Sequence, residues 1–158
     1  MIQGFWPLIC KAVIMRFNRK SVLDFFKKSE NRATLILNDK SKASSTIKDA
    51  LGKAINNKSE LDGVWSKMVL LFGVAKDYVN GDYTEIPKRS IIAILGGIIY
   101  FLSPLDIVPD FVPLLGFMDD IFVLNLVYKQ VLKDLEKYKL WKDAQLKYIG
   151  NIDDAATT

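Results

Sequence analysis

Four aspartates lie in the most hydrophobic part of the chain, within the stretch SPLDIVPDFVPLLGFMDD at residues 103–120. Asp106 and Asp110 are four residues apart, a spacing that brings two side chains to one face of a helical turn. Asp119 and Asp120 would return beside them if the chain folds back on itself. Carboxylate oxygens are the ligands that Mg²⁺, Ca²⁺ and Mn²⁺ prefer. One hypothesis is therefore a divalent-cation site, or a metal-dependent hydrolase, built on these four residues.

A structural interpretation of the same stretch competes with the cation site. Ser103 is a favoured N-cap residue, and Pro104 follows at the first helical position, where a missing N–H costs little. Asp106 at the third helical position completes a capping-box pattern. Pro109 ends this short turn, and Pro113 then keeps the chain extended. In this interpretation the serine, prolines and aspartates mark the positions where helices begin and end.

The last part of the stretch is predicted to start the final helix. The extended segment is expected to end at Gly116, and Asp119 and Asp120 lie at the expected start of the helix. Carboxylates at that end stabilise a helix by roughly 0.3–1 kcal/mol each, because they accept from free N–H groups and oppose the helix dipole. The result is a tight hairpin between two apolar arms. The first arm, residues 90–105, contains no charged side chain.

Apolar periodicity predicts helices through most of the chain and favours no strand. We expect an all-α helical bundle with an apolar Pro/Asp-rich hairpin and a long C-terminal helix. The predicted elements are a short helical turn at 21–28, the tail of a helix at 31–37 followed by a loop at 38–44, helices at 46–57 and 61–79, and a last helix at about 119–147. Asn80-Gly81 is a C-cap pattern, and Gly96-Gly97 predicts close approach of neighbouring helices.

Charge divides the chain into regions. Residues 1–60 carry 12 Lys and Arg against 5 Asp and Glu, whereas residues 61–158 carry 10 against 13. We predict a basic, partly flexible helical region at 1–60, the hairpin domain at 61–148 and a disordered tail at 149–158. Residues 1–14 are interpreted as an upstream extension before a second methionine, or as a short amphipathic membrane contact. Such a basic region favours contact with an anionic surface.

Composition excludes several classes of site. The chain has no histidine and a single cysteine, Cys10. Catalytic Ser-His-Asp and Cys-His arrangements, common zinc sites and a disulfide framework are therefore excluded. The sequence offers no phosphate-binding loop to complete a catalytic site around the aspartates, so a non-enzymatic role is favoured. It also contains no recognisable nucleic-acid-binding module, so nucleic acid is not an expected partner.

NGDYTEIP and YFLSPLDIVPDFVPLLGFMDD together resemble the YkvA-like family, a bacterial group of unknown function. The family pattern corresponds here to Ser103, Pro104, Asp106, Pro109, Asp110, Pro113, Gly116, Asp119 and Asp120. The resemblance covers roughly residues 61–135. It implies a membrane-associated helical hairpin, and it implies no established activity, substrate or cofactor.

Hairpin length and flanking charge predict how the chain would meet a membrane. Residues 90–105 would span about 24 Å as a helix, less than the roughly 30 Å of hydrocarbon, so we expect a re-entrant or interfacial hairpin. Lys88 and Arg89 precede it, and Lys129 and Lys133 follow it. This pattern predicts that both ends lie at the cytoplasmic face of the inner membrane, with the basic region on anionic lipid. The alternative is a cytoplasmic, soluble interaction module that binds a protein partner or a second copy.

Overall fold

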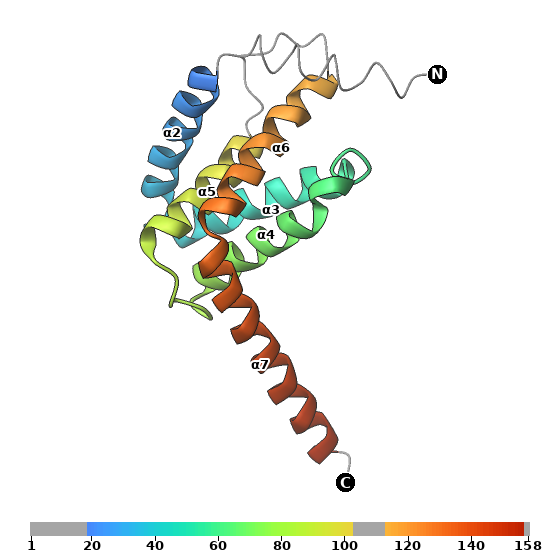
Figure 1. Cartoon of the computed structure of the whole chain (residues 1–158). Coiled ribbons are helices and arrows are strands. Elements are labelled where there is room, and N and C mark those ends of the chain that lie inside the picture. Colours follow the sequence, from blue (N-terminus) through green and yellow to red (C-terminus); the bar gives the residue numbers. More distant parts are fainter. Residues whose placement is uncertain (1–18, 103–112, 157–158) are drawn as a thin grey trace, which may run out of the picture.

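The computed structural model describes residues 19–102 and 113–156, with side chains described for 22–102 and 121–149. The predicted all-α bundle is confirmed (Figure 1). The described residues form six α-helices and one 3₁₀ turn: α2 (Arg19–Ile36), α3 (Lys40–Asn56), η1 (Asp62–Val64), α4 (Trp65–Asn80), α5 (Lys88–Leu102), α6 (Pro113–Gln130) and α7 (Leu132–Ala156).

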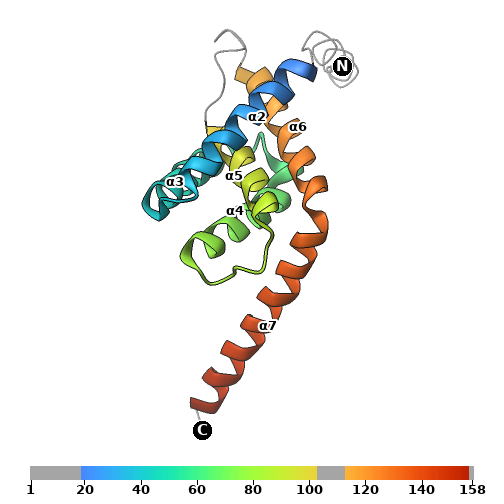
Figure 2. The same ribbon diagram turned by 90° about the vertical axis from the view of Figure 1, so that its left-hand side faces the viewer.

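Helix α5 lies at the centre of the bundle. The helices α2, α3, α4 and α6 all pack against it, and α2 does so most extensively (Figure 2). Its 15 residues include ten that are buried, among them Ile94, Leu95 and Phe101. Burying a large aliphatic or aromatic side chain is worth roughly 1.5–3 kcal/mol, so protein packing accounts for the uncharged run of the first hairpin arm.

Paired glycines set how closely two helices approach α5 from different sides. A Cβ on Gly96 would lie 3.2 Å from the backbone N and Cα of Glu30 in α2. A Cβ on Gly97 would lie 3.2 Å from Cγ2 of Val127 in α6. Because glycine has only a hydrogen atom in place of a side chain, α2 and α6 each pack tightly against α5, as the Gly96-Gly97 pattern predicted.

The basic region contributes to this same core. Val22, Phe26 and Ala33 of α2 and Ile47 of α3 are buried together with the side chains of α5. Residues on both sides of position 60 therefore contribute to one hydrophobic core.

The start of α3 differs from the prediction. The loop expected at 38–44 is shorter, because Asp39 caps a helix that begins at Lys40, with its side chain accepting from the backbone N–H groups of Ser41 and Lys42. Thr46, where this helix was predicted to begin, instead lies inside α3, and its hydroxyl donates to the carbonyl of Lys42. The helix begins at Lys40 and not at Thr46 because the Asp39 side chain satisfies free N–H groups at the earlier position.

The predicted C-cap of α4 is confirmed. Gly81 has a φ of 90°, and its N–H donates to the carbonyls of Asp77 and Tyr78. This left-handed conformation is open to glycine without the steric penalty that a Cβ would bring.

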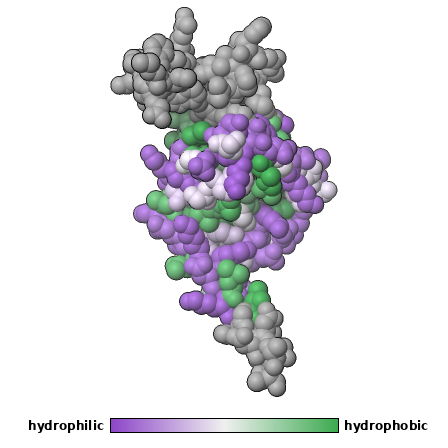
Figure 3. All heavy atoms as spheres, turned by 90° about the vertical axis from the view of Figure 1, so that its right-hand side faces the viewer, coloured by the Kyte–Doolittle hydropathy of each residue, from purple (hydrophilic) through white to green (hydrophobic). Residues whose placement is uncertain are grey.

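The single last helix predicted from about 119 to 147 is wrong in its bounds. It is divided at Val131 into α6 and α7, and α7 continues to Ala156 through part of the predicted disordered tail. Residues 149–156 contain no proline, so nothing in them forces the helix to stop. The second half of α7 projects from the bundle, and Figure 3 shows small apolar patches on this projection.

Candidate functional site

The Pro/Asp-rich stretch connects two helices that pack side by side in the bundle. Helix α5 ends at Leu102, just before the stretch, and α6 begins inside it at Pro113. Five of the predicted site residues lie outside the described residues: Ser103, Pro104, Asp106, Pro109 and Asp110. Helices α5 and α6 pack against each other, as the two arms of a helical hairpin would.

Pro113 and Gly116 do not have their predicted roles. Pro113 is the first residue of α6 rather than part of an extended segment, because its fixed φ suits the first helical position. Gly116 lies within the first turn of α6. Asp119 and Asp120 consequently lie inside the helix, beyond the first turn, and do not cap its N-terminus.

The cation hypothesis stays a prediction. Asp106 and Asp110 lie outside the described residues, and the side chains of Asp119 and Asp120 are not described. Among the side chains that the structure does describe, no three acids or cysteines come together as metal ligands would.

Helices α2 and α3 carry a dense set of exposed basic side chains. Helix α2 contains five Lys and Arg against two acids, and α3 contains four lysines against one acid. Lys27, Lys28 and Arg32 of α2 and Lys48 of α3 are all exposed. We call these four residues the basic surface. It is a described part of the charge asymmetry predicted for residues 1–60.

A buried polar cluster joins α4 to α7. Asp77 is only 7% exposed. Its Oδ2 accepts from the hydroxyl of Tyr138 at 2.7 Å and from Nζ of Lys142 at 2.8 Å. Burial alone would raise the pKa of Asp77, but these two hydrogen bonds and the positive charge of Lys142 outweigh it and lower the pKa. Burial and the hydrogen bond to Asp77 raise the pKa of the Tyr138 hydroxyl.

Aromatic packing fixes the position of Tyr138. The ring centroids of Tyr83 and Tyr138 are 5.2 Å apart in an edge-to-face arrangement, and Tyr83 lies 4.9 Å from Trp141. Such pairs contribute roughly 0.5–1.5 kcal/mol beyond area burial. The segment between α4 and α5, which carries Tyr83, thus holds the start of α7 in place.

A cavity of about 510 Å³ lies beside this cluster, between α4, α6 and α7. Four lysines line it, Lys67 and Lys76 from α4 and Lys139 and Lys142 from α7, and the one acid among its lining residues is Asp77. Sequence reasoning missed this site. Asp77 is 61 and 65 residues away from its two partners, so no local spacing reveals it.

Within residues 19–102 and 113–156, no helix combines the length and the apolar character required to cross a bilayer.

Comparisons with known proteins identify relatives of the hairpin. The family model described as "Protein of unknown function (DUF1232)" matches residues 90–126. An uncharacterized membrane protein of Bacillus subtilis, YkvA, is 32% identical over 103 residues, which cover 65% of this chain and 97% of that protein.

Two further relatives share a shorter segment. The E3 ubiquitin-protein ligases RNF170 of Xenopus tropicalis and Xenopus laevis are 52% and 48% identical over 50 residues. Each match covers 31% of this chain and 20% of the ligase. No solved structure matches the chain.

Proposed function

The chain belongs to the YkvA-like family of proteins of unknown function, and from this premise we propose that it is a membrane-associated helical protein with a structural, adaptor or regulatory role. We place it at the cytoplasmic face of the inner membrane. Its Bacillus subtilis relative is named a membrane protein, which supports membrane association.

The basic surface is the observation that carries the proposal. Lys27, Lys28 and Arg32 are exposed on α2, and Lys48 is exposed on α3. Each Lys or Arg close to an anionic membrane contributes about 1 kcal/mol to binding, so four of them give a useful affinity in total. Exposed Leu23 and Leu35, 44% and 75% exposed, lie on the same helix as three of these charges and can enter the interfacial layer.

The described helices favour contact through this surface over insertion of α5. Residues of α5 are already covered by α2, α3, α4 and α6, and exposing them to lipid would require the bundle to open. Lys88 at the start of α5 and Lys129 near the end of α6 are both exposed. Both ends of the helix pair therefore remain on one side of the membrane in this proposal.

Vesicle binding tests the basic surface. Vesicles of phosphatidylglycerol with phosphatidylcholine should bind the protein, and vesicles of phosphatidylcholine alone should not. Replacing Lys27, Lys28 and Arg32 by Gln should weaken binding on the order of a hundredfold, given about 1 kcal/mol for each of the three charges. The matched control replaces Lys133, Lys137 and Lys147 of α7, which are also exposed and carry the same total charge.

The control variant should keep nearly the affinity of the unmodified chain. Equal losses in the two triple variants would show that net charge alone, and not the basic surface, drives binding. That result would overturn the assignment of the surface while leaving membrane association itself to be measured separately.

Cysteine labelling in intact cells tests the cytoplasmic placement. In a Cys10→Ser background, cysteines introduced by Lys88→Cys and Lys129→Cys should both resist a membrane-impermeant thiol reagent until the cells are opened. Labelling of either one from outside would contradict the placement.

A further inference from the structure

The cavity between α4, α6 and α7 combines charge with apolar surface. Its lysines come from two helices, α4 and α7, and its apolar lining includes Val69 and Leu70 of α4. A volume of about 510 Å³ falls within the roughly 300–1,000 Å³ typical of small-molecule sites. The cavity is therefore large enough for an organic ligand and not only for a bare ion.

Positive charge in the cavity exceeds negative charge by three. Asp77 neutralises one lysine, Lys142, through their 2.8 Å salt bridge. Lys67 donates to Oδ1 of Asn125 at 2.7 Å, which fixes its position but leaves its charge unbalanced. The side chains of Lys76 and Lys139 make neither a hydrogen bond nor a salt bridge with any other described residue, although the charge of Lys76 helps to lower the pKa of Asp77.

Two features keep the cavity in shape without a ligand. Tyr138 and Lys142 are held by Asp77, so the α7 wall is fixed on α4. Gly73 leaves the space that Tyr138 needs, because a Cβ on it would lie 3.1 Å from the Tyr138 hydroxyl oxygen. The two remaining lysines, Lys76 and Lys139, are exposed and free to turn towards a bound anion.

We propose that this cavity binds a phosphate monoester, with the phosphate between Lys76 and Lys139 and the organic part against Val69 and Leu70. A phosphate monoester carries about −1.5 to −2 charges and three strong acceptor oxygens, which match an excess of several ammonium donors. The ester can be a soluble organic phosphate or the headgroup of a phosphatidic acid lipid. The site is distinct from the basic surface of α2 and α3, and binding of a soluble phosphate ester there does not depend on membrane association.

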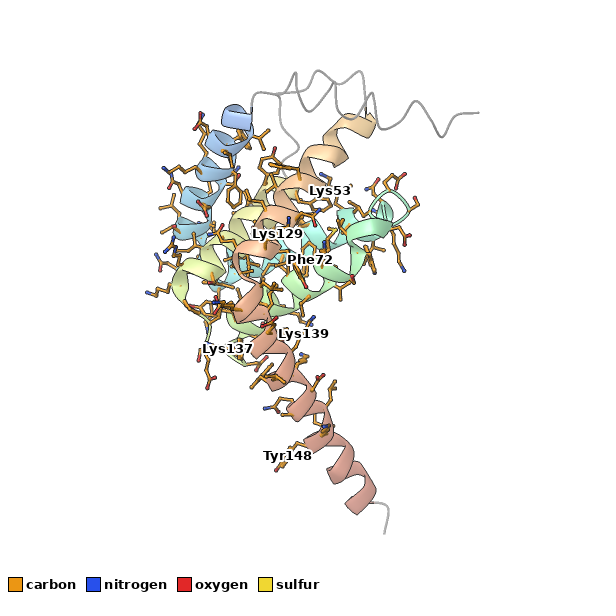
Figure 4. The ribbon with its side chains drawn as sticks, viewed as in Figure 1. Lys53, Phe72, Lys129, Lys137, Lys139 and Tyr148 are labelled. Atoms are coloured by element: carbon orange, nitrogen blue, oxygen red, sulfur yellow. The ribbon has the colours of Figure 1, made fainter. Side chains whose placement is uncertain are left out.

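Glycerol 3-phosphate is the soluble probe, because it is also the headgroup portion of phosphatidic acid. Titration calorimetry on the full chain measures its Kd, with glycerol as the uncharged control. The test variant is Lys76→Gln with Lys139→Gln. The matched control is Lys133→Gln with Lys137→Gln, since Lys137 and Lys139 lie on opposite sides of α7 (Figure 4). All four lysines are exposed, so neither variant is expected to disturb folding.

We expect glycerol 3-phosphate to bind the unmodified chain and the control alike, and to bind the test variant at least about tenfold more weakly, from the loss of charge-assisted hydrogen bonds. Absence of binding to the unmodified chain would overturn the proposal. Equal weakening in both variants would also overturn it, because general charge would then explain the affinity.

Vesicles distinguish the two sources of the phosphate. If the ligand is a lipid headgroup, the unmodified chain should prefer phosphatidic acid over phosphatidylglycerol vesicles, and the test variant should lose that preference. If the ligand is soluble, glycerol 3-phosphate should bind while the two vesicle types bind equally. Either result supports phosphate binding in the cavity. The vesicle experiment also shows whether a loss of binding comes from this site or from the basic surface.

Discussion

Replacing Gly96 by Ala should destabilise the bundle, because Gly96 lies where the backbone of α2 packs closely against α5. The new methyl group would lie 2.9 Å from Cγ of Glu30, and 3.2 Å from its backbone N and Cα. The side chain can move, but the backbone contacts require α2 to shift by a few tenths of an ångström. Overpacking of this kind costs about 1–3 kcal/mol.

Helix propensity partly offsets the clash. Alanine is favoured over glycine by about 1 kcal/mol inside a helix, which leaves a net loss of up to about 2 kcal/mol for Gly96→Ala. For a chain of this length the Tm should fall by about 2–4 °C per kcal/mol. Urea denaturation followed by circular dichroism measures the loss.

Gly52→Ala is the matched control in the same molecule. Gly52 lies inside α3 and is exposed, with nothing within 4 Å of an added Cβ. Gly52→Ala changes only the helix propensity, so the free energy of unfolding of this variant should rise by up to about 1 kcal/mol. A gain at Gly96 equal to that at Gly52 would refute the close packing of α2 on α5.

Three further predictions concern the acids and Tyr138. Asp77→Asn should cost about 1–2 kcal/mol of stability at neutral pH, and the share from Lys142 is screened by solvent because the Lys142 side chain is 45% exposed. The folded-state pKa of Asp77 is lowered, so this contribution is present above the unfolded-state pKa and is lost as pH falls through the folded-state pKa. The urea midpoints of the unmodified chain and the Asp77→Asn variant should therefore converge in acid. Tyr138→Phe should cost about 1 kcal/mol in the same assay through its lost hydrogen bond to Asp77, and an unchanged midpoint would show that this bond does not hold α7. The cation hypothesis predicts that Mg²⁺, Ca²⁺ or Mn²⁺ raises the Tm and that Asp106→Asn with Asp110→Asn abolishes the rise; an unchanged Tm with all three ions would remove the hypothesis.

Local signals in the sequence were sufficient for much of the fold. The apolar repeat of α4 and its Gly81 cap predicted that helix, since both depend on neighbouring residues. Gly96-Gly97 predicted close helix packing, although not which helices would approach. The predicted starts of α3 and α6 were wrong because several residues can serve as N-caps. Asp39 and Thr46 are both favoured cap types, and local sequence alone does not say which of them starts α3.

Long-range contacts account for what the sequence did not predict. The uncharged run of α5 has the composition of a short membrane arm, and only its neighbours α2, α3, α4 and α6 distinguish a buried core helix from one that meets lipid. Asp77 was missed for the same reason, because its partners are on α7. Sequence periodicity assigns a helical face without showing what covers it.

Cell fractionation at two salt concentrations tests membrane association most directly. The full chain, expressed in bacterial cells, should sediment with the membranes at low ionic strength. A wash with about 1 M NaCl should release much of it without detergent, because the Debye length then falls to about 3 Å and charge attraction to lipid is screened. Recovery of the whole protein in the supernatant at low ionic strength would contradict membrane association.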